Sequence, residues 1–172
     1  MESLYSDLFF TRDEAKLIDS FRSNVGKLGN QYKRALALAA MCRSLTRKVT
    51  MGHFAHTQAL VYAADPVRVK RNRSLIRPIK DIFLEILPEY NKAVFDNKED
   101  NKSFNENILN LLPRLKGVDL VYFDPPYCNS HADYQSFYHL LETFVVYWKD
   151  KQFVNGIKRY EPKRYCGFDK NT

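Results

Sequence analysis

The residues with the clearest chemical potential form one short stretch, 118–127, which reads VDLVYFDPPY. Its apolar run, Leu120–Phe123, has the length and the β-branched and aromatic content of a buried strand. Two prolines then end the run, because proline lacks the amide donor that a sheet ladder requires. The pattern predicts that Asp124 lies just past the carboxyl end of a buried strand. In open α/β sheets, ligands bind at that edge.

The four residues from Asp124 to Tyr127 could grip a flat group that carries an NH2. Pro125 and Pro126 have no N–H and hold φ near about −65°, so the turn is stiff and its carbonyls point outward. The Asp124 carboxylate and the Pro125 carbonyl would each accept one N–H, and the Tyr127 ring would stack on the face of the group. The alternative is a strand followed by a proline turn, with Tyr127 as a packing residue. Since proline makes up only about 5% of average usage, this order of residues is rare by chance, and we favour the functional interpretation.

The order Asp124-Pro125-Pro126-Tyr127 resembles the catalytic motif of adenine-specific DNA methyltransferases that act on the exocyclic amine. In that family an Asp at the first position is typical of adenine as the target, whereas related enzymes with Ser or Asn there modify other amines. Four further segments are similar to one Dam-like bacterial class: 32–39, 94–97, 137–142 and 147–148. Only the four-residue motif is highly specific.

The resemblance implies S-adenosyl-L-methionine as the cofactor, with Asp124 and Asn107 beside it. The family usually has an acidic residue where Asn107 stands, ahead of Leu111 and Leu112. Asn can hydrogen-bond an adenine but carries no charge, and Glu106 next to it could compensate. The family also needs a Phe-x-Gly-x-Gly cofactor loop, yet none of the six glycines stands at G-x-G spacing. We therefore expect a fragment or one half of a split enzyme, with an upstream-encoded partner that supplies the loop.

The fold class that follows is α/β, as a partial Rossmann-like S-adenosylmethionine-dependent methyltransferase fold with a mainly helical N-terminal part. Residues 1–100 would be a helical region for target recognition, residues 101–150 part of the catalytic domain, and residues 151–172 a basic tail.

Local signals predict four longer helices. Thr11 and Glu14 have the spacing of a capping box that starts a helix through about Lys27. Asn30 can cap an Ala- and Leu-rich helix from Gln31 to about Arg47. A third helix is predicted from Ile79 to about Asn91, with Pro88 as a flaw. The fourth, Ser136–Trp148, is rich in aromatic residues, a pattern typical of core packing.

The net charge of +7 fits a polyanionic partner. Basic residues near the ends of the second helix are interpreted as a solvated face rather than a DNA contact: Lys33, Arg34, Arg43, Arg47 and Lys48. The densest basic run extends from Asp65 to Lys80, and it lies in the interval where the resembled class commonly holds target recognition. Its density favours phosphate contact, so we assign DNA binding to Arg68, Lys70, Arg71, Arg73 and Arg77.

Other function classes find little support in the sequence. His53 and His56 are three residues apart, but no nearby acid or cysteine completes a metal site, so we interpret them as structural or surface residues. The chain has no run of about 18 apolar residues, so no membrane span is expected, and its first residues do not resemble a signal peptide. Three widely spaced cysteines favour a reducing cytoplasm.

Two hypotheses remain. The first is the catalytic part of a site-specific adenine methyltransferase that acts on DNA, with an upstream-encoded partner and a possible restriction endonuclease partner. The second is a non-catalytic remnant of such an enzyme that still binds DNA through Arg68 to Lys80. The intact motif favours the first hypothesis, whereas Asn107 and the missing loop favour the second.

Overall fold

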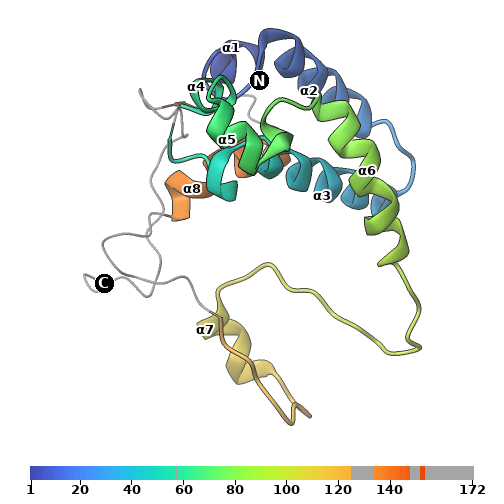
Figure 1. Cartoon of the computed structure of the whole chain (residues 1–172). Helices are drawn as coiled ribbons and strands as arrows, with labels where there is room; N and C mark the ends of the chain where they lie inside the picture. The colour runs from blue at the N-terminus through green and yellow to red at the C-terminus, as the bar shows by residue number, and fades with distance from the viewer. Residues whose placement is uncertain (57, 125–133, 148–151, 154–172) are drawn as a thin grey trace.

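The chain folds as a helical body that carries an extended arm (Figure 1). The computed structural model describes residues 1–56, 58–124, 134–147 and 152–153. These residues contain no β-strand, and Ser6 and Phe10 form an isolated parallel bridge. The elements in chain order are α1 (Glu2–Tyr5), α2 (Arg12–Val25), α3 (Gln31–Arg47), η1 (Thr50–Gly52), α4 (Ala59–Ala63), α5 (Pro66–Arg71), η2 (Arg73–Leu75), α6 (Ile79–Lys92), α7 (Ile108–Leu111), η3 (Leu112–Arg114) and α8 (Tyr134–Val146).

The first two long helices begin where their side chains cap them. The Thr11 hydroxyl accepts the Glu14 amide N–H at 3.3 Å and the Glu14 carboxylate accepts the Thr11 N–H, which confirms the capping box. The Asn30 side chain accepts the first free amides of α3, as predicted. α3 has the predicted bounds, whereas α2 ends at Val25, two residues earlier than expected.

Helix α6 packs against α3 and confirms the third predicted helix. Its buried residues Ile79, Ile82 and Ile86 lie at helical spacing and face the body. Pro88 lies inside the helix, where it removes one backbone donor. The helix nevertheless continues to Lys92, because its apolar face is already fixed by packing upstream of the proline.

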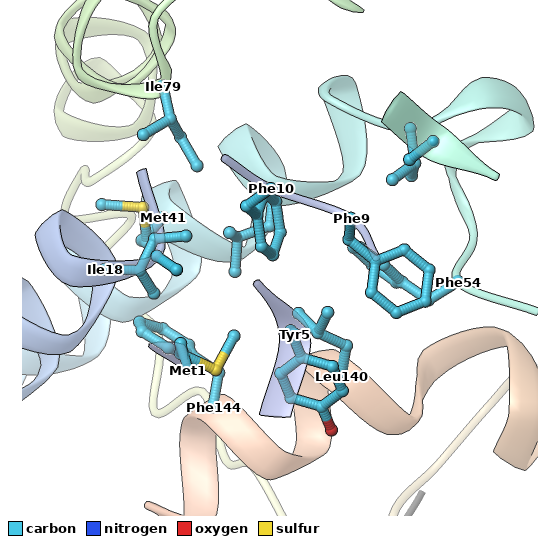
Figure 2. Close-up of a cluster of buried hydrophobic side chains, with 14 residues drawn as sticks. Met1, Tyr5, Phe9, Phe10, Ile18, Met41, Phe54, Ile79, Leu140 and Phe144 are labelled. Carbon is cyan, nitrogen blue, oxygen red and sulfur yellow. The ribbon is translucent and has the colours of Figure 1, made fainter. Parts of the chain in front are cut away.

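The main core joins residues from both ends of the described chain (Figure 2). Tyr5 and Phe9 pack with Phe54, and the Phe9 and Phe54 rings meet edge-on at 5.4 Å. From α8, Leu140 and Phe144 enter the same cluster, so the expectation that this aromatic-rich helix packs in the core is confirmed. Each fully buried side chain of this size contributes about 1.5–3 kcal/mol, which makes α8 part of the helical body.

After α6 the chain leaves the body, and no residue from 91 to 124 is buried. The predicted buried strand is wrong for the described chain: residues 118–124 have no strand structure, and Leu120 and Tyr122 are 86% and 85% exposed. The physical reason is that a strand requires partners for its backbone groups. The described residues offer no neighbouring strand, so this apolar segment stays in solvent.

Two other expectations concern the division of the chain into regions and its basic tail. The division of the chain at residue 100 stays a prediction, although α8 shares its core with the N-terminal helices. Most of the basic tail, and Trp148, lie outside the described residues. Among the helices that are described, none is long and apolar enough to cross a membrane.

Candidate functional site

The predicted amine-gripping turn begins at Asp124, the last described residue of the arm. Its carboxylate is exposed to solvent. Pro125, Pro126 and Tyr127 lie outside the described residues, so the geometry of the grip stays a prediction. What the structure does place is an exposed carboxylate that follows an apolar, unpaired segment.

Asn107 has a structural role at the start of α7. Its side-chain oxygen accepts the Leu109 amide at 2.9 Å, which leaves the side-chain NH2 as a donor. Glu106 forms an ion pair with Arg114, so its charge is already neutralised and it compensates poorly for the uncharged Asn107. Both Asn107 and Asp124 are exposed residues of the arm. The structure therefore places these two residues on an open surface of the arm.

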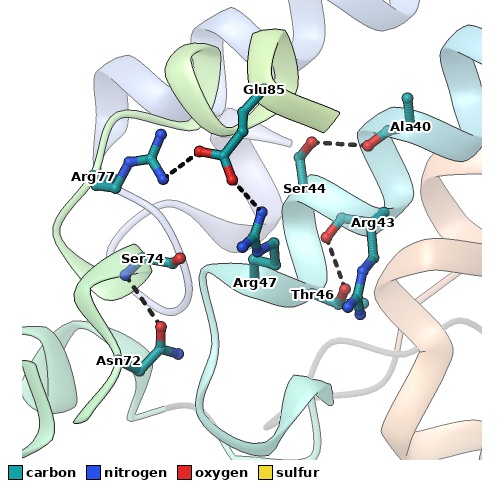
Figure 3. A network of polar contacts seen from close by, with 9 residues as sticks. All are labelled: Ala40, Arg43, Ser44, Thr46, Arg47, Asn72, Ser74, Arg77 and Glu85. Atoms are coloured by element: carbon teal, nitrogen blue, oxygen red, sulfur yellow. Dashed lines mark hydrogen bonds and ion pairs between the residues drawn. The ribbon is translucent and has the colours of Figure 1, made fainter. Parts of the chain in front are cut away.

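Arg77 of the basic run is committed to an ion-pair network (Figure 3). Its guanidinium lies 2.7 Å from the Glu85 carboxylate, and Arg47 lies 2.9 Å from the other oxygen of the same carboxylate. Hydrogen bonds from Arg77 and then Arg47 lower the pKa of Glu85 below its ordinary value. The network ties α3, α6 and the loop before α6 together.

Arg68 lies over an aromatic ring. Its guanidinium carbon lies 3.9 Å from the centre of the Tyr62 ring, and its Nε lies 3.4 Å from the Asp65 carboxylate. Asp65 also caps α5 by accepting the Val67 amide at 2.9 Å. The cap and the ring together fix the orientation of the Arg68 side chain.

Lys80 at the end of the run is exposed, and of the residues assigned to DNA binding Lys70, Arg71 and Arg73 are exposed. None of the three forms an ion pair with a described residue. They are therefore available to an external anion, whereas Arg68 and Arg77 already have acidic partners.

Lys48 is buried, so its interpretation as part of a solvated face is wrong. Its side chain is 6% exposed, and its ammonium nitrogen lies 2.8 Å from the Glu14 carboxylate. It also donates to the backbone carbonyls of Leu75 at 3.1 Å and Arg77 at 2.8 Å. Three acceptors thus saturate its three donors. Through them Lys48 fastens the end of the basic run to α2 and α3.

A cleft lies where η1, α4 and α5 meet. No sequence pattern indicates it, because its residues come from separate elements. The deeper part has a volume of about 200 Å³ and an adjoining part about 350 Å³. Thr50, Met51 and Arg68 line both parts. Met51 and Gly52 both have left-handed backbone, with φ of 65° and 72°. For Met51 that conformation is strained, and such strain is found at functional sites.

His53 forms one wall of the deeper part. Its ring stacks on Phe137 of α8, with centroids 4.4 Å apart and planes within 19°. Burial, and then the neighbouring His56, lower the pKa of His53 below its ordinary value. The ring is therefore neutral at neutral pH. No group of three His, Cys, Asp or Glu side chains within the described ranges could hold a metal ion.

A comparison with known protein families shows which family the chain belongs to. Residues 70–168 match the family described as D12 class N6 adenine-specific DNA methyltransferase. The chain belongs to this family. The match spans more than half of the chain, including the Asp124–Tyr127 motif, and it confirms the resemblance that the motif indicates.

Three relatives are similar to parts of this D12-class chain. It is 35% identical over 155 residues to the type II methyltransferase M2.HphI of Haemophilus parahaemolyticus, which covers 84% of this chain and 45% of the relative. It is 51% identical over 50 residues to the modification methylase StsI of Streptococcus sanguinis (29% of this chain, 7% of the relative). It is 42% identical over 74 residues to the type II methyltransferase M.FokI of Planomicrobium okeanokoites (41% and 11%). The chain thus spans less than half the length of these relatives. No solved structure matches it.

Proposed function

We propose that this chain is the part of a DNA adenine methyltransferase that binds DNA and grips the target amine. The whole enzyme would transfer a methyl group from S-adenosyl-L-methionine to the exocyclic amine of adenine at a specific DNA site. The observation that carries this proposal is the family match over residues 70–168, which contains both the Asp124–Tyr127 motif and most of the exposed cations of the basic run.

The chemistry assigned to the motif follows from the properties of the amine. The lone pair of the adenine amine is delocalised into the ring, so the nitrogen is a poor nucleophile. If Asp124 and the Pro125 carbonyl accept its two hydrogens, a pyramidal nitrogen with a free lone pair is favoured. The Asp124 carboxylate also stabilises the positive charge that develops on this nitrogen, and fixed positioning supplies much of the available rate gain.

The target base must leave the duplex to reach the motif. Enzymes that act on a base atom extrude the nucleotide and hold it by stacking against an aromatic side chain. We assign this stacking to Tyr127, and Pro126 keeps the turn stiff. When bound, S-adenosylmethionine supplies an electrophilic methyl group. Its contacts in this chain would include Asp124 and the amide of Asn107.

DNA binding is assigned to the basic run, and its residues contribute unequally to phosphate contact. Lys70, Arg71 and Arg73 are exposed and have no acidic partner among the described residues, so they are suited to phosphate contact. Arg68 and Arg77 contribute less to phosphate contact, because Asp65 and Glu85 already neutralise their charges. Their role would be to shape the surface that carries the other three.

A second polypeptide segment would complete the fold. We propose that residues 120–123 become a strand of a partial Rossmann-like sheet when a segment with the cofactor loop pairs with them. The exposed apolar side chains of this run support the proposal, since their burial would drive the pairing. The names of the relatives, type II methyltransferase and modification methylase, suggest a restriction endonuclease as a further partner. The sparse cysteines favour a reducing cytoplasm.

Transfer of labelled methyl groups from S-adenosylmethionine to DNA tests this function. The chain is assayed alone and together with the upstream-encoded segment, and Asp124→Ala is compared with Asp119→Ala. Asp119 is an exposed carboxylate of the same arm and serves as the matched control. We expect transfer only in the mixture, abolished in Asp124→Ala and retained in Asp119→Ala.

The second candidate is a non-catalytic DNA-binding remnant. It is favoured by the exposure of Asn107 and Asp124, the residues expected beside the cofactor. DNA binding that weakens with salt, without methyl transfer in any mixture, would establish the remnant and refute the catalytic proposal.

A further inference from the structure

The cleft between η1, α4 and α5 has two flat walls. On one side the His53 ring is held by its stack on Phe137. On another side the planar Arg68 guanidinium has its carbon 3.9 Å from the centre of the Tyr62 ring and its Nε 3.4 Å from the Asp65 carboxylate. Both groups line the deeper part of the cleft. Aromatic rings and planar guanidinium groups are the surfaces on which unstacked nucleobases stack.

The wall that the two parts of the cleft share contains a buried hydroxyl. Thr50 Oγ1 is buried and has no hydrogen-bond partner among the described residues. Thr50 lines both parts of the cleft. A buried hydroxyl without a partner is destabilising, so a ligand that carries a hydrogen-bonding edge would be favoured here. The left-handed Met51, which follows Thr50, is the kind of local strain found at ligand clamps.

The adjoining part of the cleft is suited to an anion. Arg71 and Asn72 line it together with Arg68 and Asp65, and the Asp65 carboxylate is paired with Arg68, which leaves Arg71 as the unpaired charge. Arg71 is exposed and forms no ion pair with a described residue. The deeper part, by contrast, has neutral His53 and the apolar residues Val49 and Ala59. A nucleotide combines the two groups that would fit here. Its flat neutral base suits the deeper part, and its negative phosphate suits the adjoining part.

We propose that this cleft binds one unstacked nucleotide of the DNA, other than the methylated adenine, with its base between His53 and Arg68 and its phosphate on Arg71. Thr50 donates a hydrogen bond to the edge of the base or accepts one from it. This inference rests on the proposed function, because it takes DNA as the partner. It adds a second base-binding site, distinct from the Asp124–Tyr127 motif.

Binding of two short strands of equal length, oligothymidine and a strand with the same phosphates but abasic sugars, tests the proposal. All measurements use the full chain with Asp124→Ala, so that the motif contributes less to base binding. We expect tighter binding of oligothymidine than of the abasic strand. Thr50→Val should weaken oligothymidine binding about fivefold through the lost hydrogen bond and leave abasic binding unchanged. Arg68→Met should weaken it about tenfold through lost stacking.

Matched control variants distinguish the effect of a substitution in the cleft from its general effects on charge and folding. Thr46→Val alters the same residue type on α3, where the hydroxyl bonds the Arg43 carbonyl away from the cleft. Arg43→Gln removes an exposed charge for comparison with Arg71→Gln. The cleft variants should weaken binding and the α3 variants should not, with unchanged circular dichroism. Equal binding of the two strands, or equal effects of Thr50→Val and Thr46→Val, would overturn the proposal.

A crosslinking experiment locates the base. Oligomers with 5-iodouracil should crosslink to the peptide that contains His53 or Tyr62, and a crosslink only elsewhere would overturn the assignment. The methyl-transfer assay is run on the same variants. If transfer is absent in every mixture but the crosslink persists, the proposed function fails while the base-binding site stands. If transfer occurs and the crosslink is absent, the base-binding site fails alone.

Discussion

At the scale of single residues, Glu14 links local and long-range structure. One of its carboxylate oxygens accepts a hydrogen bond from the Thr11 amide in the capping box, and the other lies 2.8 Å from the Lys48 ammonium nitrogen. The capping role follows from spacing and could be predicted from the sequence. The contact with Lys48 could not, because it depends on how α2 and α3 pack. From the sequence alone, a lysine near a helix end is predicted to be solvated, because the distant acid that contacts it cannot be identified.

Replacing Lys48 with Met should destabilise the fold by about 3 kcal/mol, because it leaves the Glu14 carboxylate buried without its cation. Lys33→Met, an exposed lysine at the other end of α3, should change the free energy of unfolding by less than about 0.5 kcal/mol. Urea denaturation measures both. Adding Glu14→Gln to Lys48→Met should recover part of the loss, and no recovery would contradict a charge-based explanation.

Glu85 should make stability depend on pH. Its folded-state pKa is lowered by Arg77 and Arg47. The pairs therefore contribute stability above the ordinary Glu value of 4.5, and this contribution is lost as the pH falls through the lower folded-state pKa. We expect Glu85→Gln to lower the urea midpoint at neutral pH and to have a smaller effect at about pH 3. An equal loss at both pH values would argue against the ion pairs.

At the scale of elements, helices were predictable and the strand was not. Thr11, Asn30 and the apolar spacing of α6 are local signals, and a helix satisfies its own backbone groups. A strand such as 120–123 needs a neighbour that the described chain does not contain. Its apolar character was read correctly, but its burial depends on pairing. The cleft also escaped prediction, because Thr50, His53 and Arg68 come together only when η1 and α5 pack.

Arg22 should fix the end of α8. It donates to the carbonyls of Phe144 at 2.7 Å and Val145 at 2.9 Å, and its guanidinium lies 4.4 Å from the centre of the Tyr147 ring. Arg22→Met removes these donors from a helix C-terminus and should cost about 1–2 kcal/mol. Thermal unfolding measures the effect, with Arg43→Met as an exposed control. Equal stability of the two variants would show that Arg22 does not hold α8.

At the scale of the whole molecule, the structure separates a packed body from an exposed arm. The body holds the core and the basic run, and the arm leads to Asp124 (Figure 1). A chain that spans less than half of its relatives' length is expected to expose surfaces that the remainder would cover. The motif was readable from the sequence because it is local. The cofactor site was not, because it needs groups from more than one segment.

Amide hydrogen exchange should follow this division. We expect rapid exchange throughout 93–124 and slow exchange in α3 and α6, because buried packing protects only the helices. Addition of the upstream-encoded segment should protect 119–123 by forming a sheet ladder. Protection of 119–123 in the chain alone would show that the run is already paired, and persistent rapid exchange in an active mixture would refute the strand proposal.

The identity of the methylated nucleoside tests the central claim most directly. DNA is incubated with S-adenosylmethionine, the chain and the upstream-encoded segment, then digested to nucleosides and analysed by mass spectrometry. We expect N6-methyladenine, which disappears with Asp124→Ala and persists with Asp119→Ala. Methylated cytosine as the product, or N6-methyladenine that persists with Asp124→Ala, would contradict the role assigned to Asp124 and its motif.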